Sequence, residues 1–173
     1  MKITNPANRD VIARVADGSA EDVDAACRAA AKALRGPWGR LSPRQRARIL
    51  FDVSRKLRDH QEELARLETS NTGKPLADSR DEAQTAGDCF EYYAGAVSKF
   101  FGETIPVGAS GLDFTLREPV GVCALIVPWN YPMMITAWKL APALACGNTV
   151  VIKPASLTPL TALRLAELCS EAG

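Results

Sequence analysis

The chain has 173 residues, of which 47% are hydrophobic and 24% charged, a composition typical of a globular protein of one domain or slightly more. Its 21 basic and 20 acidic residues leave a net charge of +1 and form no basic cluster with interleaved aromatic residues, which argues against a nucleic-acid or membrane partner. Five widely spaced cysteines without a CxxC pair favour a reducing, cytoplasmic setting over a disulfide framework, and the first residues do not resemble a secretory signal.

Residues 1–103 are predicted to be mostly helical. A first helix is expected to begin after Ser19, because Asp22 three residues later gives a near capping box, and to end at Gly36 and Pro37. Its apolar residues recur at helical spacing: Val23, Ala26, Cys27, Ala30 and Leu34.

A second helix is predicted to begin at Ser42-Pro43, where a capping residue precedes a first-turn proline. Asp59 with Glu62 is expected to cap a continuation after a bend, and SNTGKP, residues 70–75, to break the helix. The predicted buried face of the second helix consists of Ile49, Leu50, Val53 and Leu57.

A third helix is predicted from about Leu76 to Phe101, with Phe90, Tyr93 and Val97 on neighbouring faces together with Phe100. The period then changes, and ETIPVG and GLDFTLREP predict two short strands. We expect residues 104–118 to form a β-hairpin whose edge is used for assembly.

Residues 119–173 alternate between strand and helix patterns. The apolar run Gly121–Val127 predicts a strand buried on both faces, and 148–154 predicts a second one. Between them lies a predicted helix, bent near Pro142, and another helix is expected from Pro159. Strand, helix, strand, helix at these lengths predicts an α/β fold with half of a parallel, doubly wound sheet.

The uncharged run from Pro119 to Trp138 is about as long as a membrane span. Pro128, Asn130 and Pro132 would leave backbone groups unpaired in lipid, so we interpret the run as a strand, a turn and a helix.

Ligands of such sheets bind beyond the carboxyl ends of the strands, here Val127–Asn130 and Lys153–Ser156. If the two strands are neighbours, both turns border one crevice. Asn130 would then supply an amide donor, Lys153 a cation, and Trp129 with Pro128 a flat apolar surface. The patterns GxGxxG and GxxxxGK[ST] are absent, which excludes a standard Rossmann turn but leaves a nucleotide-type crevice open.

The sequence resembles the aldehyde dehydrogenase superfamily, above all its betaine-aldehyde and aminoaldehyde branch. The segments that carry the resemblance are EPVGVCALIVPWNYP, KPASLTPLTAL, TNPANRDVIARV, LETSNTGKP, EYYAG and TLREP, and together they span essentially the whole chain. The resemblance implies the N-terminal part of that fold, a homo-oligomer (dimer or tetramer), and NAD(P)-dependent oxidation of an aldehyde to a carboxylic acid through a cysteine thioester.

Several residues match family positions with a role. Asn130 matches the asparagine whose amide donates to the oxyanion, and Lys139 matches a lysine placed in a proton relay in some members. The matching cofactor-binding residues are Ile126, Val127, Pro128, Trp129, Asn130, Lys153, Ala155 and Ser156. Other interpretations stay open: a turn-capping Asn130, a solvated Lys153, and a Lys139 paired with an acid.

Two positions depart from family patterns. Ser156 stands where many NAD-preferring members carry a glutamate, and loss of that carboxylate predicts tolerance of, or preference for, NADP+ beside NAD+. Asn71 stands where some betaine-aldehyde members have an aspartate at a monovalent-cation site near Ile3 and Thr4, and its neutral amide weakens that interpretation. No catalytic metal site is expected.

The five cysteines match no family nucleophile, and we interpret Cys27, Cys89, Cys123, Cys146 and Cys169 as small core residues. The resemblance places the nucleophile and the general-base glutamate after Gly173, and a strand pair before TNPAN. We therefore expect an N-terminal fragment that is inactive alone. The alternative is a truncated, non-catalytic protein that binds a nucleotide weakly or associates with complete subunits. Tyr131 and Met134 are candidate lining residues for an aldehyde whose identity the sequence does not give.

Overall fold

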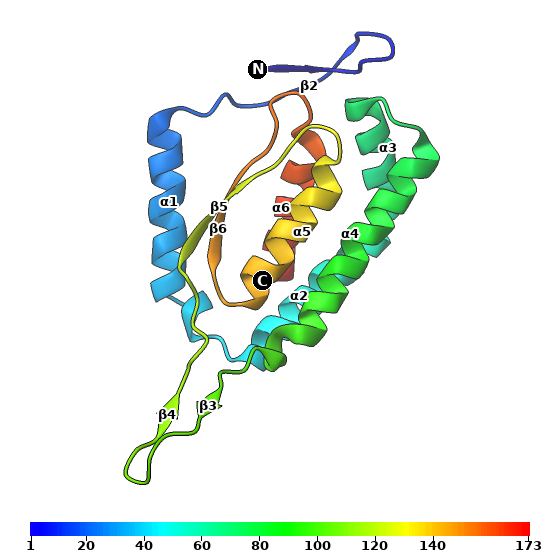
Figure 1. Ribbon diagram of the computed structural model, residues 1–173. Helices are drawn as coiled ribbons and strands as arrows, with labels where there is room; N and C mark the ends of the chain where they lie inside the picture. The colour runs from blue at the N-terminus through cyan, green and yellow to red at the C-terminus, as the bar shows by residue number, and fades with distance from the viewer.

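The computed structural model describes all 173 residues, and it begins with a strand pair rather than a helix. Strands β1 (Lys2–Thr4) and β2 (Val11–Arg14) are antiparallel, at the top of Figure 1. Polar side chains shape the connecting turn: Asn5 Oδ1 accepts from the backbone N–H of Ala7 at 2.9 Å, and Arg9 has a φ of 66°. Residues 1–103 are mostly helical, as predicted, but this strand pair before the first helix was not predicted because its turn chemistry was overlooked.

Helix α1 (Ala20–Arg35) begins as predicted. The Ser19 side chain accepts from the backbone N–H of Asp22, and the Asp22 carboxylate accepts from the backbone N–H of Ser19. Its apolar residues are little buried: only Ala30 is buried, and Val23 is 55% exposed. A hollow of about 800 Å³ separates the alanine-rich side of α1 from β6 and α6, since such short side chains do not reach across.

Helix α2 (Pro43–Asp59) begins at the predicted cap, Ser42, which forms a capping box with Gln45. Its predicted buried face is confirmed for Leu50, Val53 and Leu57, while Ile49 is half-buried. Helix α3 (Gln61–Thr72) follows the bend and ends at Gly73, whose φ of 81° requires a left-handed conformation.

Two predicted helix boundaries were wrong. The cap of α3 is His60, not Asp59, and no side chain caps it, because Glu62 pairs with arginines instead. Helix α4 (Leu76–Ala96) gives way to a 3₁₀ turn at Val97–Lys99, so Phe100 and Phe101 lie beyond it and are exposed.

The predicted hairpin is confirmed. Strands β3 (Thr104–Ile105) and β4 (Asp113–Phe114) pair antiparallel and project away from the rest of the molecule (Figure 1).

The predicted strand and helix order of the last third is confirmed as β5 (Val122–Ile126), α5 (Pro132–Ala145), β6 (Thr149–Lys153) and α6 (Leu160–Ala172). Strands β5 and β6 are parallel neighbours, with Val122 opposite Thr149 and Ile126 opposite Lys153. Helix α1 lies on one side of this pair and α5 and α6 on the other, as Figure 1 shows. The uncharged run is therefore a strand, a turn and a helix.

Burial of β5 on both faces was predicted wrongly. Leu125 and Val127 are buried, whereas Val122 and Ile126 are exposed. The physical reason is that α1 lies mainly over β6 and leaves the outer face of β5 uncovered.

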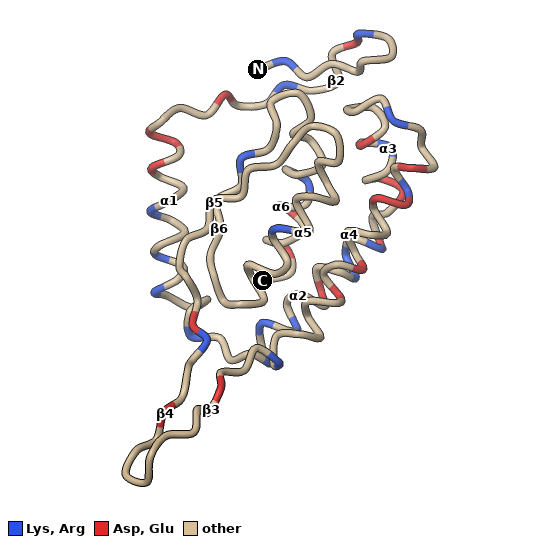
Figure 2. The backbone as a smooth tube through the Cα atoms, viewed as in Figure 1, with Lys and Arg blue, Asp and Glu red and all other residues tan.

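The core lies where α2, α4, α5 and α6 meet. Charged residues are spaced along α1 and α4, while β5, α5 and β6 are nearly free of them (Figure 2). None of the helices is both long enough and apolar enough to cross a lipid bilayer. The fully buried large side chains of the core include Leu50, Leu57, Leu64, Phe90, Met133, Leu165 and Leu168.

A charged cluster lies inside this helical layer. Lys74, after α3, forms ion pairs with Glu68 of α3 (3.2 Å) and Glu82 of α4, and both carboxylate side chains are almost completely buried. Glu68 Oε2 also accepts from the Thr161 hydroxyl at 2.5 Å. Its Oε1 has no well-aligned hydrogen-bond donor despite the nearby ammonium. The cluster therefore joins α3, α4 and α6 through polar contacts in an otherwise apolar layer.

Burial, together with the neighbouring charge of Glu82, raises the pKa of Glu68 from its ordinary value of 4.5 to about 7. The folded protein thus keeps this proton up to about pH 7, whereas the unfolded chain releases it near 4.5. Between these values the folded state binds more protons, so this group makes the protein less stable as the pH rises.

The Glu68→Gln variant tests this linkage. Relative to the unchanged protein, the variant should gain roughly 3 kcal/mol of unfolding free energy between pH 4.5 and pH 7, because the uncharged amide has no proton to lose. Urea unfolding at several pH values measures the difference. Glu63→Gln is the control. In the unchanged protein, Arg164 holds the pKa of the Glu63 carboxyl below its usual value. Above about pH 5, the unfolding free energy of the Glu63→Gln variant should change with pH in parallel with that of the unchanged protein. Parallel curves for Glu68→Gln would contradict the elevated pKa.

Candidate functional site

The turns that follow β5 and β6 lie side by side, as predicted. The backbone N–H of Val127 donates to the carbonyl of Lys153 at 3.1 Å, which extends the pairing of the strands to their carboxyl ends. The Thr158 hydroxyl then donates to the carbonyl of Trp129 at 2.9 Å. The two turns are thus tied together at one edge of the sheet, where parallel α/β sheets bind their ligands.

Asn130 lies in the first turn with an exposed side chain that forms no hydrogen bond within the chain. It does not cap α5, whose cap residue is Tyr131 without a side-chain hydrogen bond, so the turn-capping interpretation is wrong. The free amide precedes the N-terminus of a 14-residue helix, where the backbone dipole favours negative charge. Asn130 can therefore donate to an anionic oxygen.

The predicted apolar wall divides into exposed and buried parts. Ile126 is 69% exposed and Trp129 60%, and Pro128 is exposed between them. Val127 is only 3% exposed and points into the core, so only its backbone can contact a ligand. The available surface is a flat apolar ledge that suits a ring.

The second turn presents polar groups. Lys153 is exposed, and its ammonium donates to the carbonyl of Pro154 at 2.7 Å. Ala155 is half-buried and accepts from the backbone N–H of Thr158 at 3.2 Å. Ser156 is exposed, and its hydroxyl has no partner in the chain. The Ser156 hydroxyl and the Lys153 cation are therefore accessible at the same edge of the sheet.

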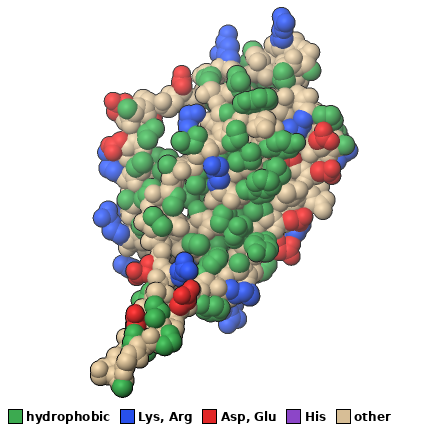
Figure 3. All heavy atoms as spheres, viewed as in Figure 1, with side chains coloured by type: hydrophobic (Ala, Val, Ile, Leu, Met, Phe, Trp, Pro, Cys, Tyr) green, Lys and Arg blue, Asp and Glu red, His purple; other side chains and the backbone are tan.

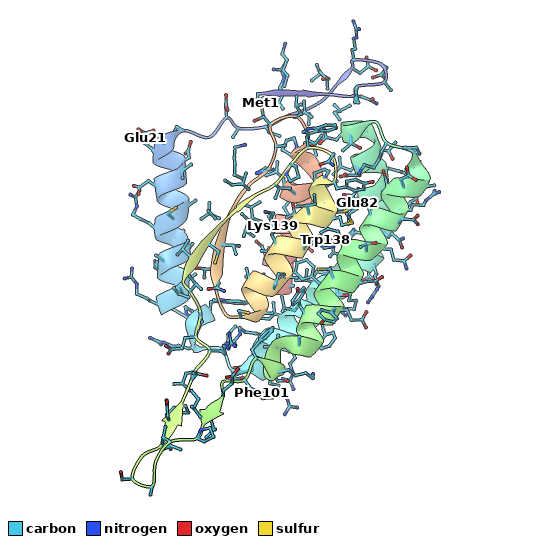
Figure 4. The ribbon with its side chains drawn as sticks, in the orientation of Figure 1. Met1, Glu21, Glu82, Phe101, Trp138 and Lys139 are labelled. Atoms are coloured by element: carbon cyan, nitrogen blue, oxygen red, sulfur yellow. The ribbon has the colours of Figure 1, made fainter.

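Lys139 does not lie with the other predicted catalytic residue. It follows Pro132 by seven positions on α5, so it is roughly 10 Å along the helix axis from the end where Asn130 lies. Its side chain is exposed next to Trp138, as Figure 4 shows, and pairs with no carboxylate of the chain. The alternative interpretation, a lysine paired with an acid, is therefore wrong.

Asn71 has a structural contact that the sequence analysis missed. Its side chain is 3% exposed; Nδ2 donates to the carbonyl of Leu157 at 3.0 Å, and Oδ1 accepts from the backbone N–H of Leu160 at 3.2 Å. The amide thus holds the turn between β6 and α6 against α3. No group of three or more His, Cys, Asp or Glu residues lies close enough to hold a metal ion.

Two features near the site were not predicted. The ammonium of Lys74 lies 4.2 Å from the ring centre of Tyr131, directly after Asn130. A surface pocket of about 460 Å³ also lies between α4 and α5, on the face where hydrophobic side chains gather in Figure 3. The aromatic residues of the segments EYYAG and AWK could have indicated this pocket. Its lining consists of Thr85, Asp88, Cys89, Tyr92, Tyr93 and Trp138.

The cysteines are only partly core residues. Cys89, Cys123 and Cys169 pack against the core, but Cys27 and Cys146 are exposed, which corrects the prediction. Cys27 lies on a little-buried helix and Cys146 follows the end of α5. Burial raises the pKa of Cys89 to about 11 and of Cys169 to about 12, and also raises that of Cys146, so these thiols stay protonated at neutral pH.

Comparisons with known proteins agree with this geometry. The family model "Aldehyde dehydrogenase family" matches residues 1–173. A phenylacetaldehyde dehydrogenase of Pseudomonas fluorescens is 48% identical over 181 residues, which cover all of this chain and 36% of that protein. Among solved structures, an NAD+ complex of aldehyde dehydrogenase from Bacillus cereus has a TM-score of 0.98 and 41% identity, covering 100% of this chain and 36% of the other.

The structure of an NADP-dependent enzyme of Escherichia coli has a TM-score of 0.96 and 41% identity. The match covers 99% of this chain and 36% of the other. The chain thus spans about a third of the length of the relatives it matches. The folds of these relatives coincide with this chain over its whole length, including the β1–β2 strand pair, the helical layer and the parallel β5–β6 pair. The chain therefore belongs to the aldehyde dehydrogenase family.

Proposed function

We propose that the complete protein oxidises an aldehyde to a carboxylic acid with NAD+ or NADP+, and that Asn130 stabilises the oxyanion of this reaction. The observation that carries the proposal is the free, exposed amide of Asn130 at the carboxyl end of β5, in a chain of this family. A donor fixed before the reaction stabilises charge that develops in the transition state.

The chemistry assigns each group one task. Addition of a cysteine thiolate to the aldehyde places negative charge on the aldehyde oxygen, and the Asn130 amide donates a hydrogen bond to it. The nicotinamide cofactor, when bound, accepts the hydride. Helix α5 adds the positive end of its dipole near the same oxygen. The residues of this chain thus bind, orient and stabilise charge.

For the cofactor, the ledge of Ile126, Pro128 and Trp129 offers an apolar surface, and Lys153 with Ser156 offers polar contacts to a ribose. Because Ser156 is neutral and Lys153 is cationic, a 2′-phosphate meets no carboxylate here. The Bacillus cereus relative is an NAD+ complex and the Escherichia coli relative is named NADP-dependent, which supports use of either cofactor.

For the aldehyde, the pocket between α4 and α5 offers Tyr92, Tyr93 and Trp138 and suits an apolar or aromatic substituent. Lys139 lies next to Trp138 and remains a proposed proton-relay residue. The relative named phenylacetaldehyde dehydrogenase is consistent with such a substrate, and assignment to the betaine-aldehyde branch stays a prediction.

Association of subunits is part of the proposal. The β3–β4 hairpin exposes Leu112 (77%), Phe114 (54%) and Leu116 (72%) in and next to β4, and apolar surface of this kind marks interaction sites. We expect it to contact another copy of the chain.

Replacing Asn130 tests the oxyanion role. Asn130→Ala in the complete enzyme should lower kcat/KM for the aldehyde by roughly 10²- to 10³-fold, because one donor to the transition state is lost. Asn8→Ala, at the exposed β1–β2 turn, is the matched control and should leave kcat/KM unchanged. Equal activity of both variants would refute the role of Asn130.

Ser156 should decide between the two cofactors. The unchanged enzyme should accept NADP+, and Ser156→Glu should lower kcat/KM for NADP+ by roughly 10- to 100-fold with little effect on NAD+, because the new carboxylate repels the 2′-phosphate. Steady-state kinetics with both cofactors measures this, with Ser98→Glu in the exposed 3₁₀ turn as the control. A strong preference of the unchanged enzyme for NAD+ would contradict the prediction.

The isolated 173-residue polypeptide should not produce NAD(P)H from an aldehyde, because none of its five cysteines belongs to the site around Asn130. It should instead bind nucleotide weakly or associate with complete subunits. Absorbance at the NAD(P)H band checks turnover, and quenching of the exposed Trp129 by NAD+ checks binding. Sustained, aldehyde-dependent NAD(P)H production is the contrary outcome.

A further inference from the structure

The buried charged cluster contacts, through its carboxylates, the first turns of the two helices that follow the site turns. Glu82 Oε1 accepts from the backbone N–H of Met134 at 3.0 Å, in the first turn of α5. Glu68 Oε2 accepts from the hydroxyl of Thr161, in the first turn of α6. The remaining oxygen of each carboxylate lies next to the ammonium of Lys74. One lysine is thus the shared partner of the two acids that hold the helices following the site turns.

Charge makes Lys74 indispensable to this arrangement. The side chains of Glu68 and Glu82 are 0% and 1% exposed, so water cannot screen them from one another. Two carboxylates in such a place repel, and each is costly to keep charged without a cation. Lys74, whose side chain is only 13% exposed, supplies that cation to Glu82, and to Glu68 once that group loses its proton near pH 7.

The charged cluster contacts residues that follow Asn130, and a separate hydrogen bond holds the residue before it. After it, Tyr131 packs its ring 4.2 Å from the Lys74 ammonium, and Met134 is bonded to Glu82, which Figure 4 shows on α4 beside α5. Before it, the carbonyl of Trp129 is bonded to Thr158 in the other turn. The Asn130 side chain itself is exposed and forms no hydrogen bond within the chain.

We propose that Lys74 is a positioning residue for Asn130: its contacts with Glu82 and Tyr131 fix the start of α5 and so aim the Asn130 amide at the oxyanion. The inference rests on the proposed function of Asn130 and adds a residue outside the site on which that function depends. Lys74 touches neither substrate nor cofactor in this arrangement and acts only through the Tyr131 ring and, by way of Glu82, the backbone of Met134. Catalytic geometry is sensitive to displacements of this kind.

A double-mutant cycle in the complete enzyme tests this coupling. The variants are Lys74→Met, Asn130→Ala and the combination, each measured for kcat/KM with aldehyde and for its melting temperature. Lys74→Met alone should lower kcat/KM by roughly 10- to 100-fold, because the amide is no longer aimed. In the Asn130→Ala background the same change should alter kcat/KM by no more than about twofold, because an interaction already lost cannot be lost again.

The melting temperature supplies the readout that separates positioning from stability. Lys74→Met should lower it by similar amounts in both backgrounds, because the unpaired carboxylates are present in both. Arg80→Met, which removes the exposed ion pair with Glu62, is the matched control and should leave kcat/KM unchanged. If Lys74→Met is insoluble, Glu82→Ala replaces it in the cycle, since it removes both the ion pair with Lys74 and the acceptor for the Met134 N–H.

Each outcome decides one claim. If Asn130→Ala has full activity, the proposed function of Asn130 fails. If Asn130→Ala is impaired but the Lys74 variant, or its Glu82 substitute, lowers kcat/KM equally in both backgrounds, the positioning role is refuted and the cluster is structural only. The proposal is supported if, in the Asn130→Ala background, Lys74→Met no longer lowers kcat/KM but still lowers the melting temperature.

Discussion

The ammonium of Lys74 between two buried carboxylates is the interaction on which the arrangement of this chain depends. Glu68 and Glu82 come from α3 and α4, and through Thr161 and Met134 they contact the first turns of α6 and α5. Apolar packing between the helices is not directional, whereas these bonds fix which turn of one helix meets which turn of the next. The ion pairs of Lys74 thus fix the register of the helical layer, which in turn supports the sheet edge. A charged group of this kind is otherwise unfavourable in an apolar core.

Most of the fold was predictable because its signals are local. Capping residues marked the starts of α1 and α2, and the change from helical spacing to branched apolar runs marked β5 and β6. Burial was predicted less well, because it depends on what covers an element. Val23 and Ile126 carry strong apolar signals, yet both are exposed, since α1 lies across a hollow, mainly over β6, and leaves the outer face of β5 open.

The site was predictable where its residues are contiguous in sequence. The segments around Asn130 and Ser156 follow adjacent parallel strands, so the topology alone brings them to one edge. The supporting residues were not predictable, because a buried Glu68 or Glu82 has the same sequence signature as a solvated helix glutamate. Asn71 illustrates the same limit: the resemblance pointed to a cation site, whereas its amide bonds two backbone groups of a turn 86 and 89 residues away.

Helix α5 has no cap of its own. Pro132 occupies its start, Tyr131 offers no side-chain acceptor, and the orphan N–H of Met134 is satisfied by a glutamate 52 residues earlier. A helix whose first turn is completed from outside gains that part of its stability only after the partner helix is in place. The start of α5, and with it the asparagine turn, therefore depends on the position of α4 as well as on its own sequence.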